Sequence, residues 1–183
     1  MSERILLHIC CGPCAIYPVQ LLQNRGFEVL GLYYNPNIQP LREYLRRRDG
    51  ARQVAEKLGI KLICRDEEYE PGQHLREVVF REPRRCYFCY RLRLERTVSI
   101  ARRGRIPWFS STLFYSKQQK HEQIHDLAKS LAGEGSPGFY YQDFRQGWSE
   151  GVETSKLWGI YRQEYCGCIY SEWERYKREL FSG

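Results

Sequence analysis

Cysteines are the residues of this sequence whose type and spacing point most directly to chemistry. The chain has eight of them in 183 residues, and seven fall in three short groups. These groups are Cys10–Cys14, with three cysteines, Cys86–Cys89, with two, and Cys166–Cys168, also with two. Cysteines that only fill a core have no reason to cluster, whereas thiolates a few residues apart can bind one metal ion. The sequence therefore indicates a thiolate metal site, and the isolated Cys64 is interpreted as an inert buried residue.

The spacing of these thiols leaves the identity of the metal open. Seven clustered cysteines exceed the four that a closed zinc site uses, and an iron–sulfur cluster also takes four thiolates. A thiol–disulfide couple, between Cys10 and Cys14 or between Cys86 and Cys89, uses the same spacing without a metal. The N-terminus has no long apolar region before a cleavage site. We therefore expect a reducing, cytoplasmic setting, in which structural disulfides are uncommon.

Charge and aromatic content favour a polyanionic partner. Lysine and arginine number 29 against 22 acidic residues, and 14 tyrosines and four tryptophans lie among the arginines. Such a surface suits unpaired RNA bases, which stack on aromatic rings, although solvated helix faces are the alternative for the arginines. A non-catalytic, zinc-stabilised RNA-binding module is thus the main alternative to a redox enzyme. The apolar runs are too short to cross a bilayer, so no membrane association is expected.

The elements that would position the cysteines alternate between strands and helices. Apolar runs at residues 4–9, 28–34 and 61–64 predict buried strands. Helices are expected between them, at about 13–22 and 40–58. This alternation favours an α/β fold with an open, mainly parallel sheet and helices on both faces. Ligands of such folds lie at the carboxyl ends of strands, and the first cysteine group follows the first strand.

The second half of the chain has a less regular pattern. The expected helices cover about 73–79, 84–103, 117–131 and 171–180, and the expected strands cover 108–112 and 139–144. Residues 145–152 are polar and contain glycine, and no helix is expected there. No repeat or low-complexity linker divides the chain, so we expect one domain spanning residues 1–183.

Four motifs, in order along nearly the whole chain, resemble the QueH family of cobalamin-independent epoxyqueuosine reductases. They are Leu7–Cys14 (LHICCGPC), Tyr33–Ile38 (YYNPNI), Arg85–Tyr90 (RCYFCY) and Tyr161–Ser171 (YRQEYCGCIYS). The resemblance implies a HUP-like fold related to nucleotide-binding enzymes with a phosphate loop. Cysteines occupy the position of that loop here, so ATP use is not expected.

The resemblance also implies an activity and its partners. In this family the epoxide on the cyclopentane ring of a modified guanine is reduced to an alkene, which gives queuosine in the tRNA anticodon. The chain is accordingly expected to be a tRNA-processing oxidoreductase of queuosine biosynthesis. Its partners would be tRNA carrying epoxyqueuosine and an electron donor that the sequence does not identify.

The cofactor implied by the resemblance is a [4Fe-4S] cluster with an adjacent iron bound by two cysteines and an aspartate. Transferred to this chain, the cluster ligands are Cys10, Cys11, Cys86 and Cys89. The adjacent iron is assigned to Cys166, Cys168 and Asp143. Asp143 is chosen because it ends a predicted strand, and the alternative for it is a helix or turn cap. Cys14 receives no role.

Epoxide removal takes two electrons and two protons, so a proton donor is also needed. His8, Tyr165 and Tyr34 are the candidates for it, and a satisfied core histidine is the alternative for His8. The candidates for base stacking are Tyr33, Tyr34, Trp148 and Trp158, for which core packing is the alternative. The candidates for phosphate contact are Arg46, Arg47, Arg84, Arg85 and Arg162.

Overall fold

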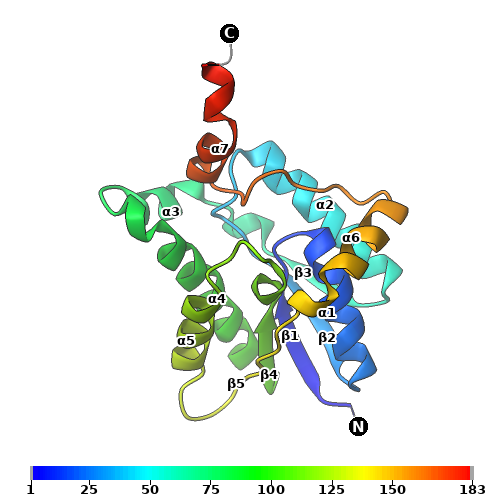
Figure 1. Cartoon of the computed structure of the whole chain (residues 1–183). Coiled ribbons are helices and arrows are strands. Elements are labelled where there is room, and N and C mark those ends of the chain that lie inside the picture. The colour runs from blue at the N-terminus through cyan, green and yellow to red at the C-terminus, as the bar shows by residue number, and fades with distance from the viewer. Residues whose placement is uncertain (1, 182–183) are drawn as a thin grey trace.

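Five strands form one open sheet at the centre of the molecule (Figure 1). The computed structural model describes residues 2–181, and the strands lie in the order β3-β2-β1-β4-β5. Their bounds are β1 Arg4–His8, β2 Glu28–Tyr33, β3 Lys61–Cys64, β4 Trp108–Ser111 and β5 Gly138–Phe139. Every neighbouring pair is parallel, which confirms the predicted α/β class.

Helices cover both faces of this sheet, as predicted (Figure 1). On one face α1 packs against α2 and α6, and on the other α4 packs against α3 and α5. The helices are α1 Gly12–Asn24, α2 Leu41–Lys57, α3 Pro71–Val78, α4 Arg85–Arg103, α5 His121–Ala132, α6 Trp148–Leu157 and α7 Ile169–Tyr176. Within residues 2–181, no helix combines the length and apolar character needed to span a bilayer.

The central strand β1 explains why the first half of the chain is predictable. Ile5, Leu6 and Leu7 are all fully buried, as expected for a parallel strand covered on both faces. Leu6 packs with Leu32 of β2 and Ile100 of α4 in one cluster, while Ile5 and Leu7 belong to the main core. Burial on both faces requires an uninterrupted apolar run, and that run is the signal in the sequence.

A close approach of α1 and α2 fixes the start of α1. A Cβ atom on Gly12 would lie 2.5 Å from the carbonyl oxygen of Gly50 and 2.8 Å from Cγ2 of Ile160. Only glycine fits this contact without a backbone shift. The first turn of α1, which carries Cys14, is therefore held against α2.

The structure corrects the prediction for residues 139–152. The predicted strand at 139–144 is wrong beyond its first residue, because β5 is only Gly138–Phe139 and the chain then leaves the sheet. Phe144 is instead buried and bonds to the carbonyl of Phe114. A helix, α6, occupies residues expected to be irregular. Its buried residues are Gly151 and Ser155, so it lacks the apolar period that identifies helices in a sequence.

Candidate metal centre

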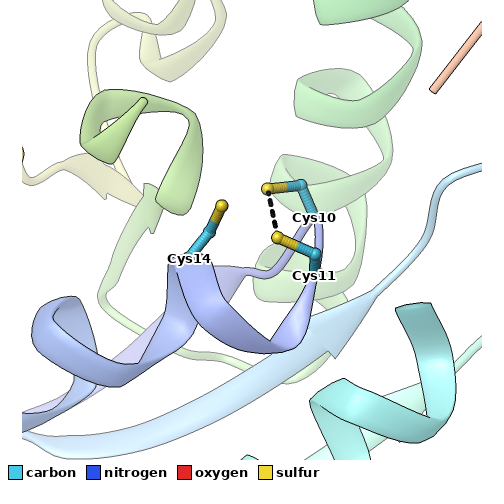
Figure 2. Close-up of side chains that lie close together, drawn as sticks. All are labelled: Cys10, Cys11 and Cys14. Atoms are coloured by element: carbon cyan, nitrogen blue, oxygen red, sulfur yellow. Dashed lines mark hydrogen bonds between the residues drawn. The ribbon is translucent and has the colours of Figure 1, made fainter. Parts of the chain in front are cut away.

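Three cysteine sulfurs meet where β1 gives way to α1 (Figure 2). The Sγ atoms of Cys10, Cys11 and Cys14 all lie within 4.8 Å of one another, and those of Cys10 and Cys11 are 3.8 Å apart. Cys11 and Cys14 are buried and Cys10 is half-buried. Convergent thiols of this kind are the donor set of zinc, copper(I) and iron–sulfur sites. We call these three residues the thiol triad.

The local backbone brings the thiol triad together. Cys11 is the extended residue that precedes α1, with φ −169° and ψ 166°. The chain turns there, and Cys14 follows three residues later, after about one helical turn. Pro13 lies in the first turn of α1, as predicted, where its missing N–H costs no hydrogen bond.

The thiol triad lies at the edge of the sheet where such folds bind ligands. The neighbouring strands β1 and β4 both end there, and they are the strands at which the order of the sheet reverses. Thr112, which follows β4, accepts a hydrogen bond from the Cys10 N–H at 3.1 Å and donates one to Cys10 Sγ at 3.3 Å. The predicted position of the first cysteine group, at the end of the first strand, is therefore confirmed.

The three thiols differ in acidity. Hydrogen bonds from Cys11 and Cys14 hold the pKa of Cys10 well below its usual range, because they stabilise its thiolate. Burial raises the pKa of Cys11, and the hydrogen bond with Cys10 raises the pKa of Cys14. Cys10 is thus the thiol of the triad that loses its proton most readily, and a bound metal ion would favour deprotonation of the other two.

Two glutamine amides donate hydrogen bonds to the cysteine sulfurs. Gln163 Nε2 lies 3.0 Å from Cys11 Sγ and 3.7 Å from Cys14 Sγ. Gln119 Nε2 lies 3.2 Å from Cys166 Sγ. Hydrogen bonds to sulfur tune thiolate-bound metals. Sequence reasoning missed both glutamines: Gln163 lies within the Tyr161–Ser171 motif, where only the cysteines were considered as thiolate ligands, and nothing in the local pattern of Gln119 separates it from surface residues.

The second and third cysteine groups border the same region. Cys166 lines a cavity of about 120 Å³ together with Cys10, Cys14 and Arg93. Arg93 Nη2 in turn lies 2.9 Å from the Sγ of Cys89. Cys89 is buried, and burial raises its pKa to about 12.

The remaining predicted ligands form no second compact set. Within residues 2–181, the thiol triad alone brings three cysteine, histidine or carboxylate ligand atoms within 4.8 Å of one another. The four predicted cysteine ligands outside it are Cys86, Cys89, Cys166 and Cys168. Their assignment to a cluster or to an adjacent iron stays a prediction.

A buried arginine positions the third cysteine group. Arg47 is 2% exposed, and its Nη1 and Nη2 donate to the carbonyls of Cys166 at 2.7 Å and Tyr165 at 2.8 Å. Its Nε pairs with Glu43 at 2.6 Å. The buried guanidinium of Arg47 holds this segment on α2 through these three bonds, and phosphate contact by Arg47 stays a prediction.

Asp143 is paired with the side chain of Arg145. Its Oδ2 lies 2.6 Å from Arg145 Nη2, and its Oδ1 accepts hydrogen bonds from Arg145 Nε at 2.9 Å and the Arg145 N–H at 3.0 Å. The hydrogen bond from Arg145 lowers the pKa of this carboxyl group. The carboxylate thus caps its own turn, which was the alternative reading, and metal binding by Asp143 stays a prediction.

His8 is a hydrogen-bonded core residue. It is fully buried, with Nδ1 2.9 Å from Ser111 Oγ and Nε2 3.1 Å from Asn35 Oδ1. Burial, and then the charge of Arg93, lowers the pKa of His8 to about 4. The ring is therefore neutral at pH 7, which matches the alternative stated for it above.

The predicted tyrosines occupy different environments. Tyr165 lines the cavity beside the thiol triad and donates its hydroxyl hydrogen bond to the carbonyl of Gln39 at 2.7 Å. Tyr33 is fully buried, and its hydroxyl donates to the carbonyl of Tyr44. Tyr34 is also buried. Core packing therefore accounts for Tyr33 and Tyr34 in this structure, and base stacking by them would need a rearrangement.

The arginines predicted to contact phosphate also lie in different environments. Arg85 pairs with Glu174, and Arg84 lies 5.6 Å from the ring of Tyr87. Arg46 and Arg162 line a cavity of about 400 Å³ with Arg42, Tyr161 and Tyr176. This cavity shares Glu164 and Tyr165 with the cavity of the thiol triad. We call the larger cavity the arginine groove.

Comparison with known proteins agrees with the motifs. The model of the family described as epoxyqueuosine reductase QueH matches residues 5–174. The chain is 36% identical to a Dehalococcoides mccartyi protein named epoxyqueuosine reductase QueH, over 96% of each chain. A Thermotoga maritima protein of the same name is 33% identical over 93% of this chain and 91% of its own length. An Acinetobacter baylyi protein of that name is 34% identical over 93% of this chain and 81% of its own.

Proposed function

Because the chain belongs to the epoxyqueuosine reductase QueH family, we propose that it reduces epoxyqueuosine in tRNA to queuosine. The match covers residues 5–174 and so includes all three cysteine groups. In the reaction both C–O bonds of the epoxide break and a C=C bond forms. Two electrons and two protons enter, and the oxygen leaves as water. The site must therefore accept electrons, deliver protons and hold a modified nucleotide.

We propose that the thiols hold a [4Fe-4S] cluster with an adjacent iron. The donor set fits, since soft thiolates are the ligands that iron–sulfur clusters take. When bound, the cluster supplies electrons singly, and the adjacent iron supplies a Lewis acid for oxygen. The proposed cluster ligands are Cys10, Cys11, Cys86 and Cys89.

For the adjacent iron we propose Cys166 and Cys168 with Cys14 in place of Asp143. Cys14 and Cys166 line the same cavity, whereas the carboxylate of Asp143 is occupied by Arg145. The Cys14 sulfur also lies within the thiol triad. Cys14 is thus the better placed third ligand.

Tyr165 is the proton donor that we propose. Burial raises the pKa of Tyr165, so its phenol keeps its proton at pH 7. Tyr165 lines the cavity of the thiol triad, and the Gln39 carbonyl fixes the orientation of its phenol. His8 is less suited, because its ring is fully buried and is neutral at pH 7.

The arginine groove is the surface that we propose for the anticodon loop. Arg42, Arg46 and Arg162 line it beside Tyr161 and Tyr176, and its acidic lining residues are Glu43, Glu164 and Glu172. Cations that meet phosphates and rings that stack on bases are the usual parts of a single-stranded RNA site. The groove shares Glu164 and Tyr165 with the triad's cavity, so we propose that one unpaired nucleotide enters that cavity while its neighbours contact the groove.

Turnover by the anaerobically loaded protein tests this function. The holoprotein is incubated with epoxyqueuosine-containing tRNA and a chemical reductant, and the nucleosides are measured by mass spectrometry. Queuosine is expected to form, and protein reloaded with zinc alone is expected to be inactive. A protein that binds the tRNA and carries zinc, yet forms no queuosine when loaded with iron and sulfide, would establish the RNA-binding alternative instead.

A further inference from the structure

One arginine of α4 is buried against the cysteines. Arg93 is 3% exposed and lies one helical turn after Cys89. Its Nη2 donates to Cys89 Sγ at 2.9 Å, and its Nε donates to the Cys89 carbonyl at 3.0 Å. The same side chain lines the cavity that Cys10, Cys14 and Cys166 border. Arg93 is therefore a fixed positive charge at the meeting point of the three cysteine groups.

Arg93 differs from its neighbours on α4 in having no carboxylate partner. Arg91 pairs with Glu77 at 3.2 Å, and Arg96 pairs with Glu68. Among residues 2–181, Arg93 forms no ion pair with a carboxylate oxygen within 4 Å. Burial of a charge is costly unless an opposite charge compensates it. The compensating anion must come from another kind of group.

The other titratable side chains near Arg93 are sulfurs and neutral rings. The charge of Arg93 acts on Cys89, Cys166 and Cys10, and on the phenol of Tyr90. His74 of α3 is 1% exposed, and burial followed by Arg93 lowers its pKa to about 4, so it adds no charge at pH 7. Among the described residues, the cysteine sulfurs are thus the groups that can compensate this charge, once a bound metal has deprotonated them.

We propose that Arg93 is the counter-ion of the thiolate-bound cofactor, and that its charge raises the reduction potential of that cofactor. This inference rests on the proposed iron–sulfur site. Four thiolates give a cluster a net negative charge, and reduction makes that charge larger. A fixed cation in a buried, low-dielectric site stabilises the reduced form more than the oxidised form. Arg93 is therefore a positioning residue that tunes the cofactor rather than a ligand of it.

The midpoint potential of the anaerobically reconstituted protein tests this role. Wild type, Arg93→Met, Arg93→Lys and Arg91→Met are titrated with reductant while the cluster is followed by absorbance and electron paramagnetic resonance. Iron and sulfide are counted in each sample. Arg91→Met is the matched control, because it removes a charge from the same helix at a half-exposed position that faces Glu77.

Arg93→Met is expected to shift the midpoint potential to a more negative value with unchanged iron and sulfide. Arg93→Lys, which keeps the charge, is expected to stay near wild type, as is Arg91→Met. A loaded Arg93→Met with the wild-type potential would overturn the proposal. If Arg93→Met does not fold or load, the lysine variant decides: loading at the wild-type potential supports the role of charge, and failure to load contradicts it. A wild type that takes up no redox-active cluster would overturn the proposed cofactor as well.

Discussion

At the scale of single residues, the environment of each thiol in the triad determines the direction in which its pKa is shifted. Cys10, Cys11 and Cys14 differ in pKa although they lie within five residues. The low value at Cys10 comes from neighbouring thiols that donate hydrogen bonds to it, and the high values come from burial and from those same contacts. Cys14 belongs to this set by position, although the ligand set implied by the family resemblance gives it no role.

Replacement of Cys14 tests its place among the ligands. Cys14→Ser is expected to lower the iron content of the reconstituted protein by about one atom per chain. Sulfide is expected to stay unchanged, because the proposed cluster ligands remain. Cys64→Ser is the control, since Cys64 lies in β3, and it should retain all its iron. Full iron content in Cys14→Ser would remove Cys14 from the site.

His74 gives a prediction for the pH dependence of stability. Neither of its ring nitrogens has a hydrogen-bond partner, and its folded-state pKa is about 4, against about 6.5 in an unfolded chain. The unfolded state therefore binds the proton more readily between these values. Above about pH 6.5 the ring is neutral in both states, and the stability of the fold is not reduced by this residue. As the pH falls from 6.5 toward 4, stability is lost, because the unfolded state takes up a proton that the buried ring does not.

Removal of that ring should flatten the acid side of the stability profile. His74→Leu is expected to be more stable than wild type at pH 5 by about 1 kcal/mol or more, with a smaller difference at pH 8. Chemical denaturation at several pH values measures this. His125→Leu, at a half-exposed position on α5, is the control. A difference between wild type and His74→Leu that does not grow as pH falls would contradict the argument.

At the scale of elements, the strand–turn–helix of β1 and α1 carries the site and depends on a glycine. Gly12→Ala is expected to destabilise the fold by about 1–3 kcal/mol, because the added Cβ meets the Gly50 carbonyl. It should also reduce iron loading, since the first turn of α1 carries Cys14. Gly26→Ala, at a φ of 85° with open space around it, should cost about 1 kcal/mol and leave loading intact. Equal loading in both variants would contradict this link.

The same elements show what a sequence can and cannot predict. The buried runs of β1 and β2, and the Pro13 start of α1, were visible because burial on both faces leaves a continuous apolar signal. The end of β5 and the helix α6 were not visible. Phe144 leaves the sheet to pack at a tertiary contact, and Gly151 lies where a Cβ would be 2.3 Å from the hydroxyl of Tyr115. Such positions are set by partners distant in sequence.

The candidate site divides in the same way. The spacing of the cysteines predicted a thiolate metal site, and the topology of the sheet predicted that the first cysteine group lies at the carboxyl end of the first strand. The buried positions of Arg47 and Arg93 were not predictable, because an arginine in a basic helix normally faces water. The glutamine contacts to sulfur likewise depend on how the segment after α6 folds back over the sheet.

At the scale of the whole molecule, the arginine groove lies beside the cavity of the thiol triad, with which it shares Glu164 and Tyr165. Arg162 lies there without an ion pair among the described residues, and its charge is available for a phosphate. Arg162→Gln is expected to weaken tRNA binding and to reduce the slope of log K against log salt by about 1. Arg103→Gln, at the far end of α4, should leave both unchanged. An unchanged slope in Arg162→Gln would contradict the proposal that Arg162 in the groove contacts a tRNA phosphate.

A single-turnover experiment tests the central claim, that thiol-bound iron and sulfide supply the electrons for epoxide reduction. The holoprotein is reduced, freed of excess reductant under anaerobic conditions and mixed with epoxyqueuosine-containing tRNA. The spectrum of the cluster and the yield of queuosine are followed together. The account predicts that the cluster is oxidised as queuosine appears, with two electrons lost for each queuosine formed, drawn from the cluster and the adjacent iron together or from two clusters. Queuosine formation with no change in the cluster, or equal formation by iron-free protein, would contradict it.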